Sequence, residues 1–224
     1  MNRTLLLSYP RSGNTWLRYC TEILTGKKTM SALRPPYNTV ESLQKLRQMS
    51  DMDKNSLTPT TKNEIILEKS HLFFGGDEEL FDKLVLIIRD YREAIPRHQP
   101  KLDDKAIELY ISPLISYDNF NGNKLVLYYE DLITDPKNTL KELLIFLGEY
   151  NEEVLEKFIS DYDTHKNNSL KVYDKFQGGN RGLYFEKGRV ENLNYHKSRI
   201  SKENIKSLNN RINHELVKRY KNDL

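Results

Sequence analysis

The chain has 224 residues, of which 38% are hydrophobic, 10% aromatic and 30% charged. This length is ample for a buried core, so we expect a single domain over residues 1–224. Thirty-five Lys and Arg against 32 Asp and Glu give a net charge of only +3, from which we predict no nucleic-acid partner. Cys20 is the only cysteine, which excludes an intrachain disulfide and a zinc site built on several thiolates.

Membrane and export signals are not apparent in the sequence. No apolar run reaches the roughly 18 to 20 residues of a membrane-spanning helix. The first residues carry too short an apolar stretch for a signal peptide. We therefore expect no membrane span and a cytoplasmic location, where a lone thiol stays reduced.

Short apolar runs predict the strands of a sheet. Thr4–Ser8 is a continuous apolar segment followed by a Tyr-Pro pair, which is typical of a strand buried on both faces. Three similar runs follow at Glu64–Glu68, Lys83–Ile88 and Lys124–Tyr129. Because helical patterns separate them, we predict a three-layer α/β fold with a central parallel sheet of about four to five strands.

Helices are predicted from the helical period and from capping residues. The first, Thr15–Leu24, places Trp16, Cys20 and Ile23 on one apolar stripe and is followed by Gly26. The others are expected at about Thr39–Met49, Tyr91–His98, Asp104–Tyr117, Pro136–Leu147, Glu152–Ser160 and Ser201–Tyr220. Residues 165–195 show no sustained period, so we expect no regular element there.

The loop between the first strand and the first helix has the composition of an anion site. The start of a helix directs unbonded N–H groups and a positive dipole end outward. Arg11 adds a forked cation, Ser12 and Thr15 add hydroxyl groups, and Gly13 permits close approach of a ligand. The loop lacks the lysine and magnesium-binding hydroxyl of nucleoside triphosphate loops. On physical grounds alone, an ordinary polar turn remains an equal interpretation.

The segment YPRSGNTW, residues 9–16, resembles the donor-binding loop of the sulfotransferases, usually Tyr-Pro-Lys-Ser-Gly-Thr-Thr-Trp in the cytosolic branch. The resemblance implies a P-loop-like fold and binding of 3′-phosphoadenosine 5′-phosphosulfate as co-substrate. It implies that the 5′-phosphosulfate is gripped by this loop, with Arg11 also catalytic, and that Trp16 stacks on the adenine. The implied loop contacts are Arg11, Ser12, Gly13, Asn14 and Thr15.

The segment Glu68–His71 is similar to the family's Lys-Thr-His motif. The resemblance implies that His71 is the general base and that Lys69 contacts the moving sulfuryl group. The chemistry agrees, because an acceptor hydroxyl must lose a proton as it attacks and an imidazole titrates near operating pH. A lone histidine after a strand is more often a packing residue, and its place beside Lys69 favours the catalytic interpretation.

Lys83–His98 resembles the strand and helix that bind the 3′-phosphate in this family. The resemblance implies that Arg89 binds this phosphate, for which a guanidinium fork is well suited. Arg97 stands where the family has a serine, so either Arg97 contributes a stronger cation to the same site or the register of the helix differs. Arg92 is interpreted as a solvated charge on the helix.

Two later segments complete the resemblance, which spans from Thr4 to about residue 203. The Tyr-Glu-Asp-Leu segment implies that Tyr129 lies near the adenine. Lys187 and Gly188 match the loop that closes over the 3′-phosphate, although Glu186 replaces the arginine of that loop.

The predicted function is in-line transfer of a sulfuryl group to an acceptor hydroxyl or amine, with protein cations in place of a metal. Two alternatives stay open. One is a nucleotide kinase-like phosphoryl transferase, because fold does not fix function. The other is a non-catalytic adenine-nucleotide-binding protein.

The acceptor is expected to be a carbohydrate-like compound or a small hydroxylated metabolite. We expect residues 27–62, 99–120 and 161–180 to shape its site, because they mix polar and aromatic side chains. The aromatic members are Tyr37, Tyr110, Tyr117 and Phe120. The sequence predicts no particular oligomeric state.

Overall fold

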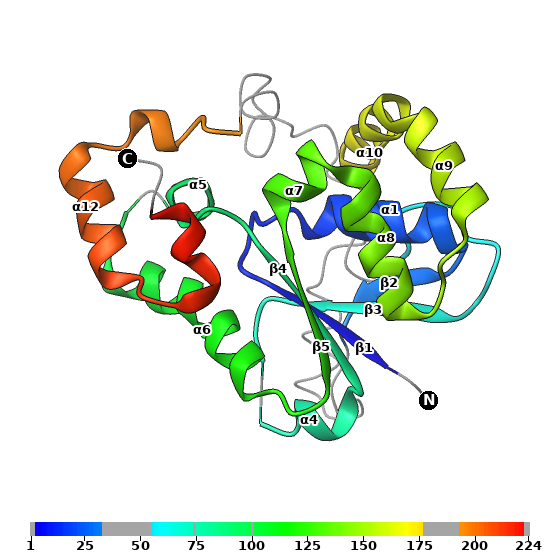
Figure 1. Ribbon diagram of the computed structural model, residues 1–224, viewed down its shortest axis with the longest axis horizontal. Helices are drawn as coiled ribbons and strands as arrows, with labels where there is room; N and C mark the ends of the chain where they lie inside the picture. Colours follow the sequence, from blue (N-terminus) through cyan, green and yellow to red (C-terminus); the bar gives the residue numbers. More distant parts are fainter. Residues whose placement is uncertain (1–2, 33–54, 74, 100, 177–192, 222–224) are drawn as a thin grey trace.

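The computed structural model describes residues 3–32, 55–73, 75–99, 101–176 and 193–221 (Figure 1). Within them, five strands form one sheet in which every neighbouring pair is parallel. In order across the sheet, they are β2 (Lys28–Ser31), β3 (Ile65–Ser70), β1 (Thr4–Ser8), β4 (Lys83–Ile88) and β5 (Asn123–Tyr128). The predicted three-layer α/β architecture is confirmed.

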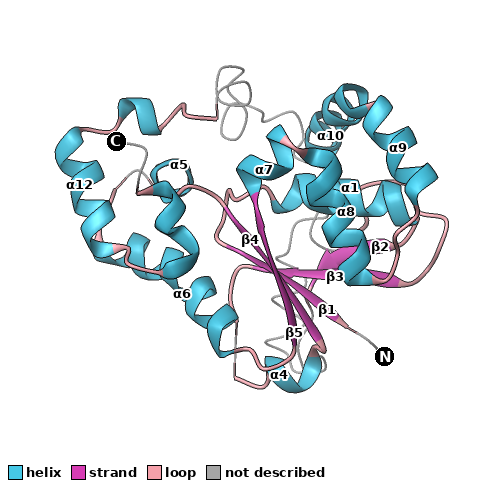
Figure 2. Cartoon of the chain, in the orientation of Figure 1, coloured by secondary structure: helices cyan, strands magenta, loops and turns pink. Residues whose placement is uncertain are grey.

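Helices cover both faces of the sheet (Figures 1 and 2). The helices that contribute side chains to the core on one face are α1 (Asn14–Thr25), α7 (Tyr129–Thr134), α8 (Pro136–Leu147) and α9 (Glu152–Ser160). Those on the other face are α5 (Tyr91–His98), α6 (Asp104–Asn119), α12 (Lys202–Arg211) and the 3₁₀ segment η3 (Glu215–Tyr220). Three further elements are α4 (Asp77–Leu80), α10 (Tyr162–Phe176) and η2 (Lys197–Arg199).

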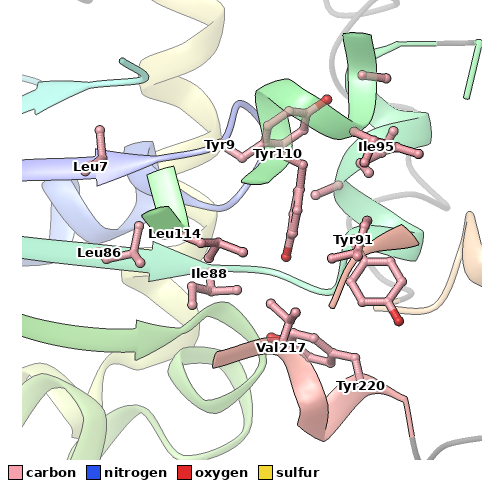
Figure 3. Packing of buried hydrophobic residues seen from close by; sticks show 14 of the residues in the cluster. Leu7, Tyr9, Leu86, Ile88, Tyr91, Ile95, Tyr110, Leu114, Val217 and Tyr220 are labelled. Carbon is pink, nitrogen blue, oxygen red and sulfur yellow. The ribbon is translucent and has the colours of Figure 1, made fainter. Parts of the chain in front are cut away.

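The central strand β1 supplies both cores. Its side chains alternate, so Leu5 and Leu7 enter the core on the α5 and α6 side and Leu6 enters the core on the α1 side. Residues paired in register with β1 face the same way, as Val85 does beside Leu6. Figure 3 shows side chains of the core on the α5 and α6 side, with Leu7, Leu86 and Ile88 on neighbouring strands and Tyr110 beside Ile88. A continuous apolar run was therefore the correct signature of this doubly buried strand.

Capping chemistry sets the ends of α8 as predicted. Pro136 occupies the first turn, and the Asp135 carboxylate accepts the N–H of Asn138. Gly148 ends the helix in the left-handed conformation at φ 77°, which glycine adopts without strain. The predicted bounds of α5, α8 and α9 agree with the structure residue for residue.

Two predictions of secondary structure are wrong, one of a segment without regular elements and one of a continuous helix. Residues 162–176 form α10 where no regular element was expected, and the Tyr162 hydroxyl ties this helix to the Leu132 carbonyl. The predicted helix Ser201–Tyr220 is two elements, because the chain turns after α12 and His214 caps η3. The expected helix Thr39–Met49 lies outside the described residues.

Strand β2 was not predicted, because its sequence Lys-Thr-Met-Ser is short and half polar. Buried polar contacts hold it instead. The Glu22 carboxylate accepts the N–H of Thr29 at 3.1 Å and also the Thr29 hydroxyl. Arg18 donates to the same threonine through Nε at 2.8 Å. The strand thus owes its place to α1 and to its pairing with β3.

A matched pair of leucine and isoleucine substitutions on α8 tests the core. Leu140 is fully buried, whereas Ile145 on the same helix is 57% exposed. Leu140→Ala should lower the free energy of unfolding by about 2 to 5 kcal/mol through lost burial and a cavity. Ile145→Ala should change it by about 0.5 kcal/mol at most. Urea denaturation of both variants measures the difference, and equal effects would contradict this assignment of the core.

Candidate functional site

The residues predicted for the site follow the carboxyl ends of four adjacent strands. Loop 9–13 follows β1, His71 follows β3, Arg89 follows β4, and Tyr129 follows β5. Because all the strands are parallel, these ends meet at one edge of the sheet, where open α/β folds bind ligands. The structure therefore brings together residues that are far apart in the sequence.

The loop after β1 takes an unusual backbone path. Arg11 has φ 69° and Gly13 has φ 91°, so both lie in the left-handed region. Gly13 is the N-cap of α1, and its carbonyl accepts the N–H of Leu17. The Ser12 side chain is fully buried, and its hydroxyl has no hydrogen-bond partner among the described residues. A buried hydroxyl beside a helix start fits an anionic ligand group.

Tyr129 and Arg89 hold this loop in place. A Cβ on Gly13 would lie 2.2 Å from Cδ2 of Tyr129, so the ring packs where any other residue would have a side chain. The Arg89 guanidinium lies 4.2 Å from the centre of the same ring and donates to the Arg11 carbonyl at 3.3 Å. Arg89 is only 3% exposed. Its place beside the loop is established, and its predicted contact with a 3′-phosphate stays a prediction.

His71 is fixed by the backbone of β1. Its Nδ1 lies 2.8 Å from the Ser8 carbonyl oxygen, which can only accept, so Nδ1 carries a proton. In the neutral imidazole, Nε2 therefore holds the lone pair. The Ser8 hydroxyl lies 3.3 Å from Nδ1 and accepts from Asn14 Nδ2 at 3.2 Å. This short chain of contacts links His71 to the first residue of α1.

Lys69 lies on the strand beside β1. It pairs in register with Leu6, and Leu67 shares its face of the sheet, which is the face that α1 covers. The side chain is partly buried, and the Lys69 carbonyl accepts the N–H of Ala32 at 2.8 Å. Lys69 and His71 thus lie two residues apart at the β3 end nearest the loop, as the motif predicts.

Arg97 shares a carboxylate with Arg89. Oε2 of Glu93 lies 4.0 Å from an Arg89 guanidinium nitrogen and 3.9 Å from Arg97 Nε. Burial raises the pKa of Glu93, against the opposing effects of the Lys197 N–H and the two arginines. Glu93 was not predicted from the sequence. The signal was available, because Glu93 and Arg97 lie four residues apart on α5 and Arg89 stands two residues before this helix begins.

His98 is a second residue at the site that the sequence analysis missed. Its ring makes an edge contact with Tyr9 at a centroid distance of 5.4 Å. Partial burial, and secondarily the charge of Arg11, lower the pKa of His98. The imidazole is therefore mostly neutral at pH 7 and lies close to the predicted sulfuryl-binding arginine.

Trp16 belongs to an aromatic cluster between α1, α9 and α10. Its ring stacks on Tyr19 at 5.5 Å and 17°, and Tyr162 meets it edge-on at 5.6 Å. Phe158 completes the cluster. The indole is 9% exposed, so its packing role is established and adenine stacking stays a prediction.

Three other interpretations of side chains are wrong. Arg92 is fully buried and pairs with the Asp90 carboxylate at 2.7 Å, so it is no solvated charge. Tyr110 and Phe120, expected at the acceptor site, are each 2% exposed and belong to the core. The Tyr110 hydroxyl donates to the Arg89 carbonyl at 2.6 Å. Tyr117 is partly buried against the same core.

Part of the predicted site lies outside the described residues, namely Lys187 and Gly188 of the expected closing loop and Tyr37 of the expected acceptor site. Within the described ranges, no group of three or more His, Cys, Asp and Glu side chains could hold a metal ion. Over the same ranges, no helix has the length and apolar character needed to cross a membrane.

Comparison with known proteins bears on this arrangement. A family model described as the sulfotransferase domain matches residues 114–221. Mouse sulfotransferase SULT7A1, solved with PAP, superposes with a TM-score of 0.65 at 16% identity over 97% of this chain and 86% of its own. The resemblance to the sulfotransferases is confirmed. Retinol dehydratase, solved with androsterone and the inactive cofactor PAP, shares the sulfotransferase fold at a TM-score of 0.58 and 12% identity over 94% of this chain and 79% of its own.

Curated relatives are WSCD family members from insects. Those of Drosophila pseudoobscura pseudoobscura and Drosophila melanogaster are 27% and 26% identical over 64% of this chain. That of Aedes aegypti is 24% identical over 68% of this chain. The alignments cover 50–52% of the relatives, so the chain spans about half their length. The sulfotransferase domain match begins after Arg89, so the roles of the earlier site residues rest on motif and geometry.

Two glycines with the same φ separate backbone strain from steric conflict at the loop. Gly13 and Gly76 both have φ 91°, but a Cβ on Gly76 meets nothing within 4 Å. Gly76→Ala should cost about 1 kcal/mol of unfolding free energy through backbone strain alone. Gly13→Ala should cost a further 1 to 3 kcal/mol, because the Tyr129 ring must move. Urea denaturation measures both, and equal losses would mean that the ring does not constrain the loop.

Proposed function

We propose that this protein is a sulfotransferase that moves a sulfuryl group from 3′-phosphoadenosine 5′-phosphosulfate to an acceptor hydroxyl. The observation that carries the proposal is the hydrogen bond between His71 Nδ1 and the Ser8 carbonyl, directly before the anion-binding loop. It orients an imidazole with a defined tautomer beside a loop suited to an anion, which supports a general-base role. Two proteins of the same fold were solved with PAP, which supports the choice of nucleotide.

The donor fits the residues at the sheet edge. The buried Ser12 hydroxyl and the first N–H groups of α1 suit the oxygens of a phosphosulfate. Arg89 Nε is also buried without a hydrogen-bond partner among the described residues, which suits a second anionic group. These groups would bind the nucleotide without a metal ion, and we propose that none is required.

The reaction is proposed to proceed in line. The acceptor oxygen bonds to sulfur as the bond from sulfur to the 5′-phosphate oxygen breaks, and His71 Nε2 takes the acceptor's proton. Negative charge grows on the departing phosphate oxygen and on the sulfuryl oxygens. Arg11, Lys69 and the N–H groups at the start of α1 stabilise that charge. The acceptor is proposed to be a small, carbohydrate-like hydroxyl compound.

Replacing His71 tests the general base. His71→Ala should lower kcat by about 10² to 10⁴, the usual contribution of a positioned base, while nucleotide affinity stays nearly constant. Ser8→Ala is the matched control, because it removes the hydroxyl near Nδ1 and keeps the carbonyl that orients the ring. Its turnover should remain within roughly tenfold of wild type. Sulfuryl transfer from labelled donor measures both, and unchanged turnover in His71→Ala would remove His71 from the mechanism.

Replacing Arg89 tests the nucleotide assignment. Arg89→Ala should weaken binding of adenosine 3′,5′-bisphosphate by roughly 10- to 100-fold and that of adenosine 5′-monophosphate by much less, because only the first offers a 3′-phosphate. Arg219→Ala, which breaks an exposed pair with Asp131, should change neither affinity.

Calorimetric titration with and without magnesium is the measurement for Arg89. An equal loss of both affinities would make the 3′-phosphate assignment wrong. Magnesium-dependent binding of ATP would instead favour phosphoryl transfer. Tight binding with no transfer to any acceptor, and no donor hydrolysis, would favour a nucleotide-binding protein without catalysis.

A further inference from the structure

Glu93 lies between two arginines of the proposed nucleotide site. It is 1% exposed and stands four residues after Arg89 and four before Arg97. One carboxylate oxygen, Oε2, is 4.0 Å from the first guanidinium and 3.9 Å from the second. A charged oxygen at this depth lies within strong Coulombic reach of both cations.

The bonding of this cluster is incomplete. Charge-assisted hydrogen bonds between guanidinium and carboxylate are usually about 2.7 to 2.9 Å long, so both of these separations are too long for one. Glu93 Oε2 and Arg89 Nε are each buried without a hydrogen-bond partner among the described residues. Buried polar atoms rarely remain so. Arg89 thus retains capacity for a further anionic oxygen.

The other carboxylate oxygen of Glu93 makes a separate hydrogen bond. Oε1 of Glu93 accepts the backbone N–H of Lys197 at 2.7 Å, which joins α5 to η2. Lys197 Nζ also approaches the Asp90 carboxylate at 3.9 Å. A glutamine at position 93 would keep an acceptor oxygen for the Lys197 N–H and remove only the negative charge. The charge and the docking contact are therefore separable by substitution.

We propose that Glu93 is an internal counter-ion of Arg89 and Arg97 that competes with the nucleotide's 3′-phosphate and so sets the affinity of the site for it. This inference rests on the proposed function, because it takes the ligand of Arg89 from there. Without ligand, the carboxylate balances the buried Arg89 and the partly buried Arg97, which would otherwise repel each other. When the phosphate binds, it shares the arginines with a like charge, which weakens its binding.

The Glu93→Gln variant tests the competition. It should bind adenosine 3′,5′-bisphosphate about tenfold more tightly than wild type, because a repulsive charge near the phosphate is gone. Its affinity for adenosine 5′-monophosphate should change less than about twofold, since that ligand places no phosphate there. Calorimetry at fixed pH and ionic strength gives both dissociation constants. An unchanged ratio of the two constants, or an equal loss of both affinities, would overturn the proposal.

A second variant covers the case in which Glu93→Gln does not fold. Glu93→Asp keeps the charge but withdraws it by one methylene, so it should give a smaller gain, confined again to the 3′-phosphate ligand. No gain in this variant would then overturn the proposal. Measurements on the wild-type protein separate the nucleotide assignment from the role of Glu93. If the wild-type protein shows no preference for the ligand with a 3′-phosphate, the nucleotide assignment fails. If it shows a preference that the Glu93 substitutions leave unchanged, only the role of Glu93 is contradicted.

Discussion

The left-handed turn at Arg11 and Gly13 is the constraint on which the site depends. The left-handed φ of Arg11 is costly for a residue with a side chain, and neighbouring strands supply the stabilising contacts. β4 contributes Arg89 to the Arg11 carbonyl, and β5 leads into Tyr129, whose ring fills the space beside Gly13. The loop is therefore shaped by two strand ends on one side, while His71 meets β1 from the other.

Most of the fold was predictable because it rests on local patterns. The strands β1 and β4 each contain a continuous apolar run, and α8 has capping residues at both ends of its own segment. The failures depend on polar tertiary contacts. β2 is held by the buried charges of Arg18 and Glu22, and α10 by contacts from other helices. The pattern of apolar residues in either segment does not reveal these contacts.

The candidate site was also predictable only in part. Motif and chemistry predicted that Arg11 follows β1 and that Lys69 and His71 lie at the end of β3, because these positions follow from the order of elements, and their catalytic roles stay predictions. The burial of charged side chains was not predicted from the sequence. Arg92 looked solvated but pairs inside the protein, and Tyr110 looked available but packs in the core while supporting the Arg89 carbonyl. Which polar side chains face inward depends on the opposite wall of the fold, which single-sequence patterns do not describe.

The strand order also has a consequence for how the chain acquires its structure. β1 ends at Ser8, yet its two partners begin only at Ile65 and Lys83, so the pairing of the central strand is complete only after both have left the ribosome. At synthesis rates of about 5 to 20 residues per second, an apolar strand waits several seconds with an open edge. Parallel pairing of this kind makes folding slow as well. The segment that carries the anion-binding loop is thus exposed to aggregation during this interval.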